Sequence, residues 1–222
     1  MKKVFSILVL ALLATNIFAQ NQDHDILLAS SNDKKGNVEM FSHLGFGYNI
    51  VKSDAIQPKD SWEFLLNILE ASYYPVENFG FQIGVDLLCE WFDQKGNTFF
   101  LNPDREVRTL GSDLNKLKGG FSTLSFNAPL LLRYRSGDFS IGAGVDGSLN
   151  VTGNAYYSYK ENKHRTTVNE NKAKVNTLSY GFMGAISYDG FGLYLRYHPK
   201  SSKLLSNSFE FSYFTIGLIW GF

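Results

Sequence analysis

The chain has 222 residues, and 21 Lys and Arg balance 21 Asp and Glu, so the formal net charge at pH 7 is zero. This balance argues against a nucleic-acid-binding protein, which would show a basic excess, and 44% hydrophobic residues exclude a disordered chain. A single cysteine excludes a disulfide framework within the chain and a zinc site built from thiolates.

Residues 1–19 have the features of a secretory signal peptide. Lys2 and Lys3 precede an apolar run that ends at Leu13, which is short for a membrane-spanning helix, and the segment closes on the small residue Ala19. We therefore predict cleavage between Ala19 and Gln20. The residue directly after this junction is Gln20 and not a cysteine, so we expect no lipoprotein anchor. Residues 20–36 lack regular alternation and are predicted to form a flexible periplasmic N-terminal segment.

From residue 37 onward, apolar side chains alternate with polar or small ones, which is the period of a β-strand. The pattern predicts eight strands, over residues 38–50, 62–74, 81–91, 126–134, 139–151, 178–188, 191–197 and 212–222. In the second run the apolar positions change parity at Ile68 and Leu69. This change predicts a β-bulge, because one extra residue shifts the following side chains to the opposite face.

The predicted connections alternate between short and long. Tight turns fall at 75–80, 135–138 and 188–190, whereas the segments 52–60, 93–119, 152–174 and 199–207 are longer and polar. Outer-membrane barrels have short periplasmic turns and longer external loops. The sequence therefore predicts an all-β fold in which residues 37–222 form an eight-stranded antiparallel up-and-down transmembrane β-barrel.

The apolar faces indicate which side of the barrel faces lipid. An eight-stranded barrel is just wide enough for its own side chains, so bulky Phe, Tyr, Trp and Leu from every strand would not fit inside. We expect these side chains to face hydrocarbon and the small or polar ones to face the lumen, with every backbone group paired in the closed sheet. Aromatic residues near the strand ends fit the two interfacial girdles of such a barrel.

Charged residues recur at positions of lumen parity and form a candidate polar network of Glu39, Asp86, Glu90, Arg133, Asp146 and Arg196. Such charges could form a proton path or line a pore. We favour buried ion pairs and hydrogen bonds that fill the narrow lumen. This interpretation predicts a barrel without a wide pore.

The last strand alternates to the end of the sequence through Phe214, Ile216, Leu218, Trp220 and Phe222. This ending resembles the C-terminal assembly signal of Gram-negative outer-membrane proteins. The resemblance implies that the barrel-assembly machinery is a partner during insertion.

The segment Phe126-Asn127-Ala128-Pro129-Leu130-Leu131-Leu132-Arg133-Tyr134-Arg135 resembles a mid-chain strand of the porin-like outer-membrane β-barrel family of Gram-negative bacteria, in an eight-stranded, OmpA-type form. The resemblance spans roughly residues 37–222. The sequence departs from the family after the penultimate strand, where His198 runs directly into Pro199 and Lys200. The resemblance implies an outer-membrane location and a barrel fold, and it supplies no substrate.

Motifs that would carry chemistry are weak. Gly142-Ala143-Gly144-Val145-Asp146-Gly147 matches a dinucleotide fingerprint, but it lies within a predicted strand and no helix follows to meet a pyrophosphate. The histidines His24, His43, His164 and His198 show no metal-ligand spacing. We therefore predict no cofactor, no metal site and no catalytic residue.

Two classes of function remain at this stage. The first is a structural or surface-binding protein that acts through its external loops, where Tyr156, Tyr157, Tyr159, Lys160, Lys163, His164 and Arg165 offer aromatic and basic contacts. The second is an outer-membrane enzyme resembling a lipid-A deacylase, which needs a His and a Ser on the lipid-facing wall; a small-solute porin is a further alternative. His43 and His198 have lumen parity, which favours the non-enzyme. The expected partners are outer-membrane lipid and an unidentified external ligand, with no nucleic acid.

Overall fold

The computed structural model describes residues 37–53, 60–95, 98–101, 104–110, 118–161, 164–206 and 210–221. The predicted signal peptide with its cleavage site at Ala19 and Gln20, the predicted segment 20–36, and Phe222 lie outside these residues. Within the described ranges, no helix is long and apolar enough to cross a membrane.

The described chain is built almost entirely from β-strands. These are β1 (Asn37–Phe41), β2 (His43–Lys52), β3 (Trp62–Val76), β4 (Phe79–Lys95), β5 (Thr98–Leu101), β6 (Val107–Leu110), β7 (Lys118–Ser136), β8 (Phe139–Glu161), β9 (His164–Ala173), β10 (Leu178–Tyr188), β11 (Phe191–His198) and β12 (Ser212–Gly221), with one short 3-10 helix, η1 (Lys200–Ser202).

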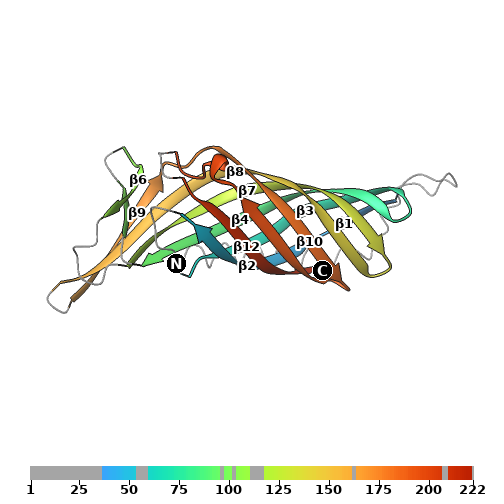
Figure 1. Cartoon of the computed structure of the whole chain (residues 1–222), viewed down its shortest axis with the longest axis horizontal. Coiled ribbons are helices and arrows are strands. Elements are labelled where there is room, and N and C mark those ends of the chain that lie inside the picture. The colour runs from blue at the N-terminus through green and yellow to red at the C-terminus, as the bar shows by residue number, and fades with distance from the viewer. Residues whose placement is uncertain are drawn as a thin grey trace.

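The strands close into a ring. In order around it, β2, β3, β4, β7, β8, β10, β11 and β12 each pair antiparallel with their neighbours, and β12 pairs with β2. The short strand β1 precedes β2 and pairs with the far end of β3. Figure 1 shows the resulting barrel lying on its side. The predicted eight-stranded antiparallel up-and-down barrel is therefore confirmed.

The two ends of the barrel differ. Tight turns join β3 to β4, β7 to β8 and β10 to β11, and the last two use Gly137 and Gly190 at φ values of +58° and +77°, which glycine adopts without strain. In Figure 1 the strands β6 and β9 lie at the opposite end, to the left. We refer to these as the turn end and the hairpin end.

The long connections 93–119 and 152–174 were expected to be loops, and this expectation is wrong in part. The pairing of β4 with β7 continues as far as the pair Lys95 and Lys118. β5 and β6 form a separate hairpin, and β8 continues into a hairpin with β9. These strands extend beyond the apolar stretches. The apolar alternation of the other strands does not continue through these extensions in the sequence, so the pattern did not predict them.

The β-bulge in β3 is where the parity change predicted it. The pairing of β3 with β4 shifts register between Asn67 and Leu69, so Ile68 is the extra residue. Ile68 and Leu69 are both exposed on the outer face, whereas Asn67 and Glu70 are both buried. The bulge therefore keeps polar side chains inside on both halves of the strand.

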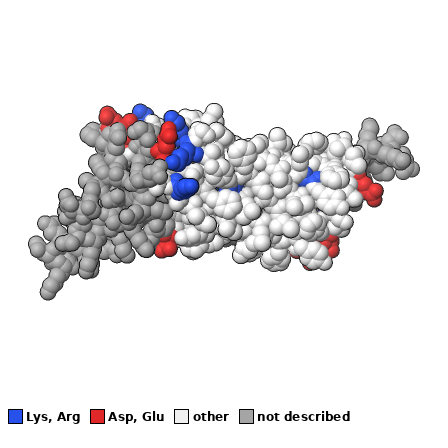
Figure 2. Space-filling model, viewed as in Figure 1, with Lys and Arg blue, Asp and Glu red and all other residues white. Residues whose placement is uncertain are grey.

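The outer face carries a continuous belt of exposed apolar side chains, with Ile83 60% and Leu132 64% exposed. Figure 2 shows this belt as a broad uncharged zone, with the charged side chains of this face gathered mainly toward the two ends. At the hairpin end Trp62 packs against Tyr48 with ring centroids 4.9 Å apart, and at the turn end Phe79 packs against Tyr134 at 4.9 Å. These pairs occupy the positions expected for the two aromatic girdles.

The interior is less uniformly small and polar than the sequence suggests. Large side chains such as Leu65, Leu88, Leu131 and Tyr194 are almost completely buried on the lumen side. They fill space between the polar groups, so glycine and serine account for only part of the lining.

Candidate functional site

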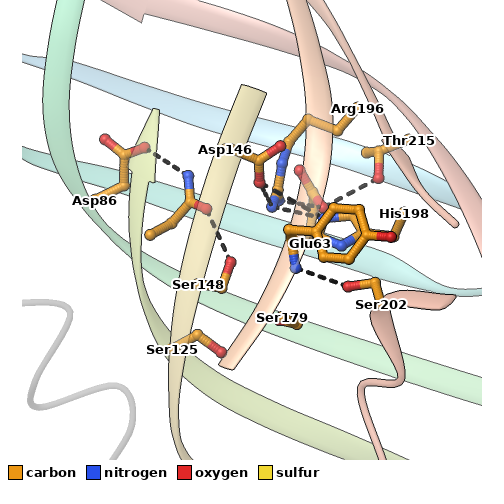
Figure 3. A network of polar contacts seen from close by, with 12 residues as sticks. Glu63, Asp86, Ser125, Asp146, Ser148, Ser179, Arg196, His198, Ser202 and Thr215 are labelled. Carbon is orange, nitrogen blue, oxygen red and sulfur yellow. Dashed lines mark hydrogen bonds and ion pairs between the residues drawn. The ribbon is translucent and has the colours of Figure 1, made fainter. Parts of the chain in front are cut away.

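The centre of the lumen is occupied by the guanidinium group of Arg196. Its Nη1 lies 3.0 Å from Glu63 Oε2 and its Nη2 lies 2.8 Å from Asp146 Oδ2, and all three side chains have no exposed surface. Arg196 is on β11, Glu63 on β3 and Asp146 on β8, and none of these strands are neighbours in the ring. The arginine therefore bridges the lumen and ties three separate parts of the wall together (Figure 3).

Neutral groups complete the coordination of these charges. Tyr194 Oη donates to Glu63 Oε1 at 2.8 Å and Thr215 Oγ1 lies 3.1 Å from Glu63 Oε2. Arg196 Nη2 also lies 2.8 Å from His198 Nε2. We call the set of Arg196, Glu63, Asp146, His198, Tyr194 and Thr215 the Arg196 cluster. Charges buried this deeply need such partners, because an unpaired ion in a low-dielectric interior is strongly unfavourable.

Glycines make room for the tyrosine of this cluster. A Cβ atom at Gly217 would lie 2.2 Å from Tyr194 Cε1, and one at Gly47 would lie 2.5 Å from Tyr194 Oη. Gly217, Gly47 and Glu63 follow Tyr194 in one row across the adjacent strands β12, β2 and β3, so both glycines allow the ring to lie along the inner wall and reach Glu63. By contrast, a Cβ at Gly147 would meet nothing within 4 Å, because Gly147 faces outward.

Two further buried carboxylates, Glu90 and Asp86, lie on β4, which pairs with the strand of Glu63. Glu90 accepts hydrogen bonds from Tyr213 Oη at 2.6 Å and Thr123 Oγ1 at 2.9 Å. Asp86 accepts from the side-chain amides of Asn67 at 2.7 Å and Asn127 at 3.2 Å. Each of these carboxylates is therefore held by two neutral donors. Those of Asp86 come from the neighbouring strands β3 and β7, whereas Tyr213 reaches Glu90 from β12, which is not paired with β4.

A second charged group lies toward the turn end. Arg133 Nη1 lies 3.4 Å from Glu70 Oε1, and Arg133 Nη2 donates to Ser140 Oγ at 3.0 Å. Glu70 Oε2 lies 3.2 Å from His43 Nδ1. These residues line a cavity of about 350 Å³ whose other wall includes Met183. The interior is therefore hollow at the turn end.

The hairpin end is covered by an apolar cluster. Side chains from the hairpin-end parts of the barrel strands pack with Val107 of β6 and with residues of the connection between β11 and β12. Within this cluster Phe92 stacks on Phe121, with ring centroids 4.6 Å apart. We call this the mouth cluster; its buried members are Val51, Phe92, Val107, Phe121, Ala155, Ala173, Leu204, Leu205, Phe211 and Tyr213. Tyr213 also stacks on His198 at 4.5 Å, so the mouth cluster continues directly into the Arg196 cluster.

The six residues of the predicted lumen network do not form one connected group. The structure brings Arg196 and Asp146 into direct contact and places Glu90, Asp86 and Arg133 in three other sets of hydrogen bonds. The side chain of Glu39 lies outside the described residues, although its backbone pairs with Ser72.

Sequence reasoning missed the partners Glu63, Glu70, Tyr194 and Tyr213. A signal for the first two was present, because the bulge at Ile68 predicts that Glu63 before it and Glu70 after it both point inward. The tyrosines could not be distinguished from girdle aromatics by residue type.

The C-terminal strand presents its apolar residues to the outside. Ile216, Leu218 and Trp220 are exposed and Phe214 is half-buried in β12. Their role as an assembly signal stays a prediction, and Phe222 lies outside the described residues. Among the predicted loop contacts, Tyr156 donates a hydrogen bond to Asp93, and the side chains of Tyr159, Lys160, Lys163, His164 and Arg165 lie outside the described residues.

The arrangement around His198 does not resemble a hydrolase site. Its Nε2 faces the guanidinium group of Arg196 instead of a serine hydroxyl, and the ring is buried in the lumen. A serine nucleophile requires a histidine nitrogen within hydrogen-bond reach. Ser202, which Figure 3 shows nearby, instead accepts a hydrogen bond from the backbone N–H of Tyr180 at 2.7 Å.

The geometry defines a class of protein. A closed ring of eight antiparallel strands, with an apolar exterior, two aromatic girdles and a polar interior, is the architecture of bacterial outer-membrane β-barrels. The described chain has this architecture.

Comparisons with known proteins give distant similarities only. No family model and no curated protein matches the chain. Among solved structures, Ail, the attachment invasion locus protein of Yersinia pestis, is 13% identical with a TM-score of 0.39 and covers 85% of this chain and 99% of its own. Neisserial surface protein A is 9% identical with a TM-score of 0.36, covering 84% of this chain and 99% of its own.

Proposed function

We propose that this protein is an integral outer-membrane barrel that is closed to solutes and acts at the cell surface, structurally or as a binding protein, through its hairpin end. The observation that supports closure to solutes is the packing of side chains inside the barrel. The Arg196 cluster lies within the lumen and the mouth cluster covers its hairpin end. An eight-stranded barrel leaves no aqueous bore once side chains fill it.

The hairpins support a role at the surface. β8 and β9 pair up to Glu161 and His164, and the backbone N–H of Leu101 on β5 donates to Glu170 Oε2 at 2.6 Å. The β5–β6 and β8–β9 hairpins are therefore connected beyond the apolar belt. Loops carried by a rigid scaffold are the usual site of recognition in such folds.

Conductance measurements distinguish the closed barrel from a small-solute porin. We expect the purified protein, reconstituted in a planar bilayer, to show no stable ion conductance. An ion would have to pass both the mouth cluster and the Arg196 cluster to cross the barrel. The double variant Phe211→Ala and Leu205→Ala, which loosens only the mouth cluster, is expected to stay closed as well. Long-lived channels in the unmodified protein would support the porin instead.

Labelling of single cysteines tests the location and the orientation. In a Cys89→Ala background, Thr167→Cys on β9 and Asp138→Cys in a tight turn both place an exposed thiol. We expect a membrane-impermeant maleimide to label Thr167→Cys on intact cells, and Asp138→Cys only after the outer membrane is permeabilised. The opposite pattern would reverse the topology, and recovery of the protein in the soluble periplasm would contradict membrane insertion.

A further inference from the structure

The outer face of the barrel contains a groove that runs beside a row of bulky side chains. Outward side chains of β7, β8 and β10 lie in register and form three successive rows. The row nearest the hairpin end is Phe126, Leu149 and Leu178, and the row nearest the turn end is Leu130, Val145 and Phe182. The row between them is Ala128, Gly147 and Tyr180. A cavity of about 620 Å³ lies over this row, and the bulky side chains that line it are Val85, Phe126, Leu149, Leu178 and Tyr180. Because Ala128 and Gly147 are small, they form its floor.

The groove leads to hydroxyl groups at the hairpin end of β10. Tyr180 Oη lies 2.6 Å from Ser201 Oγ, and the backbone N–H of Tyr180 donates to Ser202 Oγ at 2.7 Å. Both serines belong to η1, which follows the end of β11. The groove therefore ends where the sheet ends, and a polar pair marks that end.

Basic side chains gather beside this end of the groove. Lys174 and Lys203 lie on adjacent segments of the chain. The backbone carbonyl of Lys174 accepts hydrogen bonds from Ser206, and the side-chain amide of Asn176 donates to the backbone carbonyl of Lys203. Lys172, Lys174, Lys200 and Lys203 are all exposed, and Lys203 lies 3.0 Å from Glu210. Figure 2 shows basic side chains next to the edge of the uncharged belt at this end.

We propose that this groove binds one phosphorylated membrane lipid. A fatty acyl chain lies over Ala128 and Gly147, and the phosphate group contacts the lysines and the hydroxyl pair of Tyr180 and Ser201. An apolar channel that ends in hydroxyls and ammonium groups matches the chemistry of such a lipid, since each basic residue near a membrane surface attracts anionic headgroups. The inference rests on the proposed insertion in the outer membrane, which sets the groove against hydrocarbon.

Native mass spectrometry of the purified protein in detergent tests this proposal. Dimyristoyl phosphatidic acid is the probe, dimyristoylglycerol is the same lipid without phosphate, and inorganic phosphate is the headgroup without chains. We expect saturable binding of one phosphatidic acid and at least about tenfold weaker binding of the other two. Equal binding of dimyristoylglycerol would overturn the role of the phosphate, and equal binding of inorganic phosphate would overturn the role of the groove.

Two variants assign the binding to this surface. Gly147→Phe fills the groove without a clash in the wall, and we expect about tenfold weaker lipid binding; Ala143→Phe, also outward on β8 but nearer the turn end, is the matched control. Lys174→Gln with Lys200→Gln is expected to weaken binding by about fivefold per lysine, against Lys52→Gln on β2, three strands from β10. Unchanged binding in Gly147→Phe would overturn the proposal.

The mobility shift on heating in detergent gels shows separately that each variant is folded. Fractionation and labelling in cells report on membrane insertion independently of the titration. A folded, inserted protein that fails to bind phosphatidic acid would therefore contradict the lipid site alone.

Discussion

Replacement of Arg196 by methionine is expected to lower the free energy of unfolding by about 3–5 kcal/mol. The guanidinium group is the cation that faces both Glu63 and Asp146, and all three side chains lack exposed surface. Removal of the cation leaves both carboxylates buried without a compensating positive charge. Urea titration of the barrel refolded in short-chain lipid vesicles, followed by tryptophan fluorescence, measures this change.

Neutral replacement of the whole group separates the charge effect from the loss of packing. The triple variant Arg196→Met, Glu63→Gln and Asp146→Asn is expected to recover most of the lost stability, because a buried ion pair replaced as a unit is often nearly neutral. Arg135→Met is the control, since this half-buried arginine lies over the Tyr74 ring at 5.4 Å, and its loss is expected to cost about 1 kcal/mol or less. A stable Arg196→Met variant would contradict the assignment of the cluster as the centre of the lumen.

Introduction of arginine at Val145 is expected to impair insertion. Val145 lies midway along the apolar part of β8, faces outward with 47% exposure, and is flanked by Leu130 and Phe182. An arginine on the lipid face at the bilayer midplane costs about 2–4 kcal/mol. We expect the heat-shiftable, folded form to fall in the outer-membrane fraction, with a matching rise in degraded or unfolded protein.

A matched arginine beyond the apolar belt tests whether depth is the cause. Thr166→Arg lies on β9, where the side chain is exposed at the hairpin end. This variant is expected to insert as well as the unmodified protein. Normal insertion of Val145→Arg would mean that the uncharged zone in Figure 2 does not face hydrocarbon.

The sequence by itself determined the wall of the barrel. Alternation with period two separates outward from inward side chains, because successive residues of a strand point to opposite faces. The change of parity at Ile68 located the bulge in β3, and the alternation of short turns with long connections predicted the up-and-down topology. These features are local, so they can be read without knowing which strands become neighbours.

Only the tertiary structure decided which inward groups meet. Arg196 and Glu63 are 133 positions apart and lie on strands that are not paired, so their contact exists only after the ring has closed. The same holds for Tyr213 and Glu90, and Phe211, which directly precedes β12, likewise meets Phe92 in the mouth cluster only in the closed ring. Contacts across a lumen depend on the tilt and stagger of all eight strands together. Parity along one strand predicts that a side chain points inward, and only the closed barrel determines which other side chains it contacts.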